Sequence, residues 1–249
     1  MSGLTVETTN VSEGWVQACA ALLAQPGHEA NHLVVRMSDP LPEEPQIRAA
    51  ADALMIAGDH QDVDEVRNTI FPAELAADFP EPAELAEAYL EDYDTLKIFS
   101  PQGTYFGRLC AYPRPSGAPG PQLQNTVAKL REARAHDRWR ARYELNLHAE
   151  HKDHSKRRNF FPCLSHLNFQ LGGPDHGRLD CLALYRFQDL TLKGYGNLLG
   201  LAQLQEYVAA ATEFEPGELT VVDGHAALTL GPATREPLRA LVAERVDGV

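Results

Sequence analysis

Two alternating apolar segments joined by a tight turn place the strongest constraint on how this chain can fold. Residues 161–171 and 178–187 each carry the period-two pattern of a strand, and the sequence GGPDHG lies between them. Glycine, proline and aspartate are typical of turns, so the two segments predict a β-hairpin. A helical segment at 197–212 and a strand segment at 219–228 follow. Strands that neighbour one another along the chain favour an α+β fold over a regular βαβ alternation.

The remaining segments alternate between α and β patterns without an internal repeat. Apolar periodicity, capping residues and proline positions predict helices at 12–25, 46–57, 82–93, 122–135 and 234–246. Strands are expected at 32–37, 103–112 and 139–148, and the sequence PRPSGAPGP predicts a loop at 113–121. A length of 249 residues suits one large domain or two small ones.

Charge and cysteine content exclude several classes of protein. The net charge of −13 would repel polyanions, so we expect no general nucleic-acid binding, although a small basic pocket for one phosphate is compatible with it. No segment approaches the ~20 apolar residues of a membrane span, and the N-terminus lacks the pattern of a signal peptide. We therefore expect a cytoplasmic protein without membrane attachment. The four cysteines form no CxxC pair and no zinc-finger spacing with histidine, so a buried, reduced thiol is the ordinary interpretation of each.

An ordered set of residues within 161–228 indicates that one of the cysteines has a functional role. A Pro-Cys pair precedes the first hairpin strand, an R-x-x-D arrangement ends the second, an asparagine begins the long helix, and the last strand contains a histidine. These residues are Pro162, Cys163, Arg186, Asp189, Asn197 and His225. In this order and spacing the run resembles the thymidylate synthase family, as do the sequence PGEL before the last strand and the upstream segments TYFGRL and QLQNTVAKL.

The resemblance covers about half of the chain and carries expectations about its fold. It implies one thymidylate synthase-like domain across residues 1–249, in which the N-terminal part has diverged. It also implies a mixed sheet packed with helices, one long buried helix, and a homodimer formed by sheets packed back to back.

Cys163 is the predicted nucleophile. A thiol attacks an electron-poor carbon as the thiolate, which nearby positive charge stabilises, and hairpin pairing would bring Arg186 close to it. The resemblance implies that Cys163 adds to ring C6 of a pyrimidine nucleotide, that Arg186 binds its phosphate, and that C5 then attacks a one-carbon electrophile. The donor implied is 5,10-methylenetetrahydrofolate.

Four of these residues have both a functional and an ordinary interpretation. Asn197 offers a donor and an acceptor that suit the O4 and N3–H edge of uracil, so a uridine-type substrate is favoured; asparagine is also a common helix N-cap. His225 would contact the sugar hydroxyl, or it is a hydrogen-bonded core histidine. Asp189 would hold ordered water or contact the ring. Arg186 would bind phosphate or pair with a surface acid.

Several positions depart from the family pattern and place the details of the ligand in doubt. Leu164 follows the nucleophile where the family usually has histidine, and Asn168 stands in place of a glutamine, as a shorter amide in the substrate site. Phe187 replaces a serine and Ala227 replaces a tyrosine, which removes two polar contacts to phosphate and sugar. The ligand is therefore expected to be smaller, differently substituted or held differently.

The N-terminal half has no clear copy of the family's other functional segments. Three arginines are the candidates for those that reach a partner's substrate, and in a strand they would share one face; a solvated edge strand is the alternative. These arginines are Arg138, Arg140 and Arg142. The candidates for the proton-handling acid are Glu65, Glu74 and Glu84. The short segment after His225 leaves the use of folate open.

Three functions are compatible with these residues. The first is a pyrimidine nucleotide C5 methyltransferase or hydroxymethyltransferase, with hydroxymethyl transfer favoured by the altered contacts. The second is a nucleotide-binding protein, or a thiol-dependent enzyme, that does not use folate. The third is a cysteine hydrolase in which His166 or His225 serves as the base for Cys163.

Overall fold

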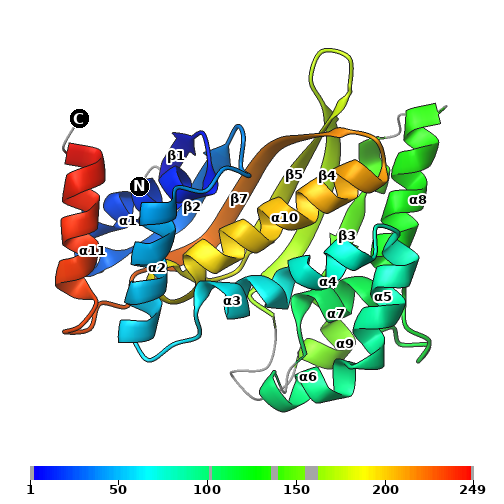
Figure 1. Cartoon of the computed structure of the whole chain (residues 1–249), viewed down its shortest axis with the longest axis horizontal. Coiled ribbons are helices and arrows are strands. Elements are labelled where there is room, and N and C mark those ends of the chain that lie inside the picture. Colours follow the sequence, from blue (N-terminus) through cyan, green and yellow to red (C-terminus); the bar gives the residue numbers. More distant parts are fainter. Residues whose placement is uncertain (1–2, 101–102, 136–139, 155–161, 248–249) are drawn as a thin grey trace.

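A seven-stranded mixed sheet organises the protein (Figure 1). The computed structural model describes residues 3–100, 103–135, 140–154 and 162–247. Across the sheet the strands run in the order β1-β2-β7-β5-β4-β3, and β6 pairs with β7. Their bounds are β1 (Thr5–Thr8), β2 (Glu29–Met37), β3 (Glu144–Asn146), β4 (Leu164–Gly172), β5 (Arg178–Tyr185), β6 (Gln188–Asp189) and β7 (Glu215–Ala227). With the helices that pack on it, this sheet confirms the expected α+β class.

The predicted hairpin is confirmed. β4 and β5 pair antiparallel, with Phe169 opposite Cys181, and the turn between them contains Gly173 at a φ of 75°. Glycine suits that position because it has no Cβ to oppose a positive φ. β7 then joins β5 in parallel and β2 antiparallel, so the last long strand lies in the centre of the sheet.

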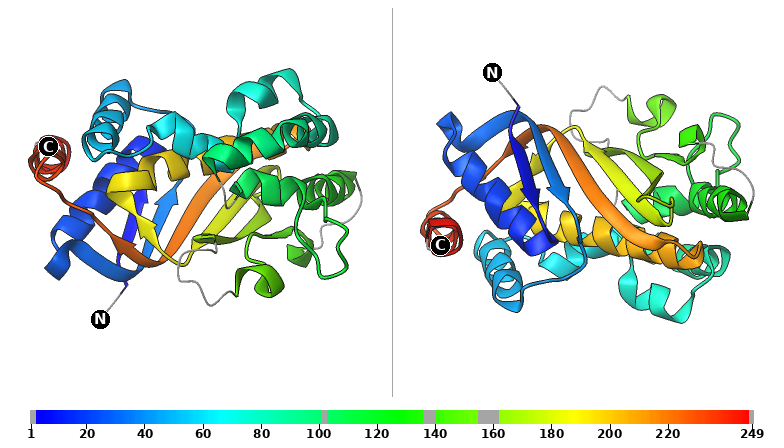
Figure 2. Two further views of the ribbon diagram at one scale, coloured as in Figure 1. Left: turned by 90° about the horizontal axis from the view of Figure 1, so that it is seen from below. Right: turned by 90° about the horizontal axis from the view of Figure 1, so that it is seen from above.

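Eleven α-helices are formed by the residues that the structure describes. They are α1 (Val11–Leu23), α2 (Pro45–Ala57), α3 (Val63–Ile70), α4 (Ala73–Asp78), α5 (Pro82–Glu91), α6 (Tyr93–Phe99), α7 (Tyr105–Cys110), α8 (Gln122–Ala135), α9 (Glu150–Asp153), α10 (Tyr195–Ala211) and α11 (Arg235–Val242). Short 3-10 or π-helical segments are η1 (Pro26–His28), η2 (Arg140–Arg142), η3 (Leu190–Gly194) and η4 (Ala243–Asp247). Figure 2 shows the helices of residues 45–99 on the same side of the sheet as α10.

α10 is the central helix of the fold, and its side chains are buried on several sides. Leu198, Leu201 and Val208 are among its buried residues. It packs on β5 and β7 and also on α1 and α3, and Figure 1 shows it crossing the sheet. A helix that is apolar around most of its circumference requires partners on several sides, because exposure would leave apolar surface in water.

Two glycines of α10 allow α3 to approach closely. A Cβ added at Gly196 would lie 2.8 Å from the backbone oxygen of Val63 and 2.8 Å from Val66 Cβ. A Cβ added at Gly200 would lie 3.0 Å from Ile70 Cβ. The two helices therefore pack backbone to backbone along this line.

One predicted strand is wrong and another is shorter than expected. The segment 103–112 contains helix α7, which begins because the Thr104 side chain accepts a hydrogen bond from Gly107 N at 3.0 Å, and which buries Phe106 and Leu109. Its aromatic residues favoured a strand in the sequence, but the N-cap and the packing decide otherwise. The segment 139–148 forms a strand only at Glu144–Asn146.

The correction at 139–148 also removes an expected arrangement of arginines. Residues Arg140–Arg142 form the 3-10 segment η2, so they do not alternate on one strand face. Arg138 lies outside the described residues. The structure also adds β1, α3, α4 and α6, which the sequence patterns did not predict.

Substituting Gly196 with alanine should destabilise the protein. Helix propensity alone would favour alanine by about 1 kcal/mol. Overpacking against a backbone oxygen, which cannot rotate away, costs about 1–3 kcal/mol. We expect a net loss of up to about 2 kcal/mol in the free energy of unfolding, measured by urea denaturation.

Gly177 provides the matched control for this substitution. No atom lies within 4 Å of a Cβ added there, so Gly177→Ala should change stability by less than about 0.5 kcal/mol. If Gly196→Ala were more stable than the wild type by the helix-propensity gain of about 1 kcal/mol, the close packing of α3 on α10 would be refuted.

Candidate functional site

The hairpin brings Arg186 to the Pro-Cys segment. Cys163 lies directly before β4 and is partly buried, and its carbonyl oxygen accepts a hydrogen bond from Arg186 N at 2.8 Å. Arg186 Nε also donates to the carbonyl oxygen of Pro162 at 3.3 Å. The guanidinium therefore lies against the segment that carries the predicted nucleophile, at the end of β5.

A tyrosine completes the surroundings of the thiol. Tyr105 is the first residue of α7, and burial, together with the nearby Cys163, raises the pKa of its phenol to about 12. Interactions with the backbone of Leu164 and Cys163, and with the charge of Arg186, oppose this increase in pKa. A thiol, a phenol and a guanidinium from three distant parts of the sequence thus lie together.

A row of buried side chains continues from the thiol across the sheet. Leu164 lies opposite Tyr185 on β5, and Tyr185 lies opposite Asp223 on β7. Burial, with contributions from Tyr105, Asp223 and Cys163, raises the pKa of Tyr185 well above its ordinary value. The Tyr185 hydroxyl has no hydrogen-bond partner among the described residues.

Asp223 is a buried carboxyl group without an ion pair among the described residues. Its exposed fraction is 0%, and burial raises its pKa from the ordinary value of 3.8 to about 8. Desolvation disfavours the charged form of an acid, which is why the pKa rises. Asp223 is therefore a buried acid that changes its charge close to neutral pH.

Asn197 connects α10 to this acid through a glutamine. When the Gln188 amide is oriented to suit its neighbours, its nitrogen donates to the two carboxyl oxygens of Asp223 at 3.0 and 3.2 Å. Its oxygen accepts from Asn197 Nδ2 at 2.9 Å. Asn197 is not the helix N-cap, because Gly194 occupies that position. The alternative structural role considered for Asn197 is therefore wrong.

Asp189 has a structural role that explains it without a ligand. Its carboxylate caps η3 by accepting from the backbone N–H of Thr191 at 3.0 Å and of Leu192 at 3.1 Å. Thr229 Oγ1 also donates to it. Its charge raises the pKa of the buried Cys19 thiol, although burial has the larger effect there. These contacts direct Asp189 towards α1 and η3.

The two candidate histidines have partners on both ring nitrogens. His166 contacts Asn146 Oδ1 at 3.2 Å and pairs with Glu144. His225 contacts Asn31 Oδ1 at 2.8 Å and Glu29 at 3.5 Å, and it stacks on Phe187. Neither arrangement leaves a ring nitrogen free to accept the proton of Cys163, which argues against a cysteine hydrolase that uses His166 or His225 as its base.

The remaining candidates for substrate binding lie elsewhere. Asn168 donates to Glu144 Oε1 on the less buried face of the sheet. Arg142 pairs with Glu132 of α8 at 3.0 Å. The backbone of Arg140 belongs to η2, and its side chain lies outside the described part of the structure. The structure thus does not bring Asn168 or Arg142 to Cys163.

A cavity of about 470 Å³ lies between α3, α4, α5 and α6. Its lining includes Thr104, which directly precedes Tyr105, and two of the candidate acids, Glu65 and Glu74. The ion pair with Arg67 lowers the pKa of Glu74, so that residue is a carboxylate rather than a proton donor. Glu84 is exposed on α5.

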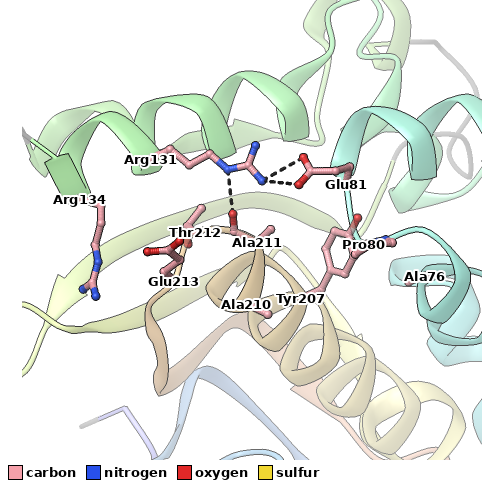
Figure 3. Close-up of a pocket in the computed structure, with 10 residues that line it drawn as sticks. All are labelled: Ala76, Pro80, Glu81, Arg131, Arg134, Tyr207, Ala210, Ala211, Thr212 and Glu213. Carbon is pink, nitrogen blue, oxygen red and sulfur yellow. Dashed lines mark hydrogen bonds and ion pairs between the residues drawn. The ribbon is translucent and has the colours of Figure 1, made fainter.

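A second cavity, of about 690 Å³, lies at the C-terminal end of α10 (Figure 3). Arg131 donates to the carbonyl oxygen of Ala211 at 2.8 Å and pairs with Glu81 at 3.0 Å. The first contact satisfies a backbone carbonyl group at the C-terminal end of α10, and the second links α8 to the beginning of α5. The cavity lies at the opposite end of α10 from Asn197, so we assign it no part in the thiol site.

Sequence analysis missed Tyr105, Gln188, Tyr185 and Asp223. Tyr105 lay within the segment TYFGRL that carried the family resemblance, which was a signal towards it. An aspartate two residues before the predicted His225 was visible, but nothing in a single strand indicates that it is buried beside a glutamine. That information depends on the pairing of β7 with β5 and β6.

No protein-family model matches the chain, and no curated protein sequence matches it significantly. Among the described residues, no helix is long and apolar enough to cross a membrane. The same part of the chain contains no group of three or more histidine, cysteine, aspartate or glutamate residues placed to hold a metal ion.

The buried acid predicts how stability depends on pH. The folded-state pKa of Asp223 is raised, so its contribution to stability is fully present below the unfolded pKa and is lost as pH rises towards about 8. Relative to Asp223→Asn, the wild type should lose roughly 2–4 kcal/mol of unfolding free energy between about pH 5 and about pH 8. Urea denaturation of both proteins across this range checks it, and parallel pH curves would contradict it.

Proposed function

We propose that this protein is a pyrimidine nucleotide C5 one-carbon transferase with a thymidylate synthase-like arrangement of its site. The observation that carries the proposal is that the Tyr105 phenol interacts electrostatically with both Cys163 and Arg186, while the Arg186 guanidinium donates to the carbonyl oxygen of Pro162 beside the thiol. The buried amide of Asn197 adds a group that can read the edge of a ring. Such an assembly suits addition of a thiolate to an electron-poor ring.

The first step proposed is addition of Cys163 to the ring. The sulfur forms a bond to C6, the C5=C6 double bond breaks, and its electron pair is delocalised over C5 and O4. Arg186 stabilises the attacking thiolate through its positive charge and contacts the substrate phosphate. The proton lost by the thiol goes to solvent or to a neighbouring base.

Tyr105 has a distinct part in the proposed reaction. Its phenol stays protonated at neutral pH because burial raises its pKa to about 12. A neutral phenol beside the sulfur can donate a hydrogen bond to the thiolate without adding a competing negative charge. To complete the transfer, a base near the ring would take the C5 proton, and tetrahydrofolate would leave as its bond to the transferred methylene breaks. Water would then add to the exocyclic methylene as the sulfur leaves C6, which gives the hydroxymethyl product.

The one-carbon electrophile proposed is 5,10-methylenetetrahydrofolate, which supplies a methylene group at the oxidation level of formaldehyde. The cavity beside Thr104 has features that fit a flat heteroaromatic ring: apolar Pro72 and Leu75, and acidic Glu65. The buried Asn68 Oδ1 there has no hydrogen-bond partner among the described residues. Glu65 and Asn68 would therefore accept hydrogen bonds from the N–H groups of a pterin.

A covalent trap tests this proposal. With 5-fluoro-dUMP and methylenetetrahydrofolate, the wild type should form a stable ternary adduct, because C5 carries fluorine and cannot lose a proton. Intact-protein mass spectrometry should show near-complete conversion, and Cys163→Ala should show none. Cys110→Ala, which alters a buried thiol elsewhere, should react like the wild type. Absence of any wild-type adduct would overturn the proposal.

The alternative function is a thiol-dependent nucleotide site that does not use folate. The observation favouring it is that the Arg142, Asp189 and His225 side chains have protein partners instead of facing Cys163. An adduct that forms equally well without folate, and is lost in Cys163→Ala, would support this function over one-carbon transfer.

We also propose that the chain forms a homodimer through the sheet face that faces away from α10. Along β5 this face carries Leu182 and Leu184, which are 38% and 39% exposed, and β7 places Val222 opposite Leu184. Exposed apolar residues that are adjacent on one sheet face are typical of a protein interface. A two-fold axis through this patch would place it against the same patch of a second copy, so the two patches would bury each other.

The double substitution Leu182→Glu with Leu184→Glu should separate the dimer. Two carboxylates in each half of the interface would be desolvated against one another, which should weaken association by more than about tenfold. Analytical ultracentrifugation should give twice the chain mass of 27.4 kDa for the wild type and that mass for the variant. Ile98→Glu, at a position 73% exposed on α6, should remain dimeric. A monomeric wild type would refute the dimer.

A further inference from the structure

Three buried polar groups form a continuous hydrogen-bonded chain when the Gln188 amide is oriented to suit its neighbours. Asp223, Gln188 and Asn197 have exposed fractions of 0%, 2% and 5%, so none of them is solvated by bulk water. They come from β7, β6 and α10. Gln188 stands in the middle and contacts the carboxyl group on one side and the Asn197 amide on the other.

The direction of this chain depends on whether Asp223 carries a proton. A carboxylate only accepts hydrogen bonds, so the Gln188 nitrogen must face it, and the Gln188 oxygen must then face Asn197 Nδ2. A protonated carboxyl group can donate to the Gln188 oxygen instead. The Gln188 nitrogen then faces Asn197, which must turn its own oxygen inwards. The same heavy-atom positions serve both directions.

We propose that Asp223 and Gln188 form a proton-coupled relay that sets the orientation of the Asn197 amide and thereby selects between a uracil and a cytosine ring. The relay rests on the proposed function for its choice of ligand, because a pyrimidine nucleotide is the substrate proposed for this site. Gln188 and Asp223 act as positioning residues, and Asn197 is the residue that contacts the ring.

The selection follows from the hydrogen-bonding edges of the two rings. Uracil presents an acceptor at O4 and a donor at N3–H. Cytosine presents a donor at its 4-amino group and an acceptor at N3. Reversing the Asn197 amide exchanges its oxygen and nitrogen, which converts the complement of one edge into the complement of the other. An asparagine that could turn freely would bind both rings, so discrimination requires a neighbour that fixes it.

The groups packed around Asp223 leave it as the titrating member of the relay. β5 places the Tyr185 phenol beside it, β2 places Leu33 opposite it, and β6 and α10 contribute the uncharged amides of Gln188 and Asn197. Burial raises the pKa of Tyr185 well above its ordinary value, so that phenol stays neutral. Burial also brings the pKa of Asp223 to about 8.

Side-chain amide signals in nuclear magnetic resonance spectra test the relay in the free protein. The ¹⁵N-labelled amide groups of Gln188 and Asn197 should shift together with one midpoint, the pKa of Asp223, which burial raises above the ordinary range of an aspartate. The shift should vanish in Asp223→Asn. The buried Gln205 amide, which donates to the carbonyl oxygen of Leu179 at 2.7 Å, is the internal control and should not titrate. Signals that do not move, or that still titrate in Asp223→Asn, would overturn the relay.

Calorimetric binding of dUMP and dCMP tests the selection. In the wild type, the ratio of the two dissociation constants should change by about tenfold between one pH unit below and one above the midpoint, since a mispaired hydrogen bond costs roughly one power of ten. In Gln188→Leu the ratio of the two dissociation constants should change by less than about twofold over the same pH range, because the Asn197 amide is no longer held in one orientation. Gln205→Leu removes a buried amide from α10 and should retain the wild-type behaviour.

The two experiments separate failure of the relay from failure of the proposed function. If neither nucleotide binds the wild type, the proposed function and the selection both fall, while the amide signals still decide whether the relay exists. If both nucleotides bind and their ratio is independent of pH, or if Gln188→Leu keeps the wild-type change, the selection is overturned and the proposed function stands.

Discussion

The close packing of α10 between the sheet and α3 is the constraint on which the rest of the structure depends. Gly196 and Gly200 bring the two helix backbones together, so the polar groups on α10 lose access to water. A buried amide without partners is costly, and each one must find them within the protein. Gln205 donates to strand carbonyl oxygens, and Asn197 reaches the acid of β7 through Gln188. The packing that stabilises the helix thus also creates the polar network.

Strand register then determines what lies near the thiol. The pairing of β4 with β5 and of β5 with β7 aligns Leu164, Tyr185 and Asp223 in one row. The row extends from Leu164, next to Cys163, to the buried acid Asp223 two strands away. A slip of one residue in either pairing would turn these side chains to the opposite face and separate the two groups. The site is therefore a property of the sheet as much as of the residues.

The sequence predicted the elements whose signals are local. The hairpin follows from alternation and a glycine turn, and α10 from its apolar length. Helix α7 was missed because one short turn of aromatic residues resembles a strand until its cap and its packing are known. Cys163 and Arg186 were brought together correctly because both belong to the hairpin. Gln188 and Asp223 were beyond reach, because their contact depends on β6 pairing with β7 across a helix of seventeen residues.

The partners of the two candidate histidines argue against acyl transfer at Cys163. A hydrolase needs a base that removes the thiol proton and then protonates a leaving group. Both candidate histidines instead make hydrogen bonds or ion pairs through each ring nitrogen. The proposed addition to a ring needs a thiolate stabilised by positive charge and a fixed contact for the ring edge, and Arg186 and Asn197 are the residues that we propose for these two roles. Burying Asp223 costs stability, and a site that must hold one amide orientation gives a physical reason to keep it.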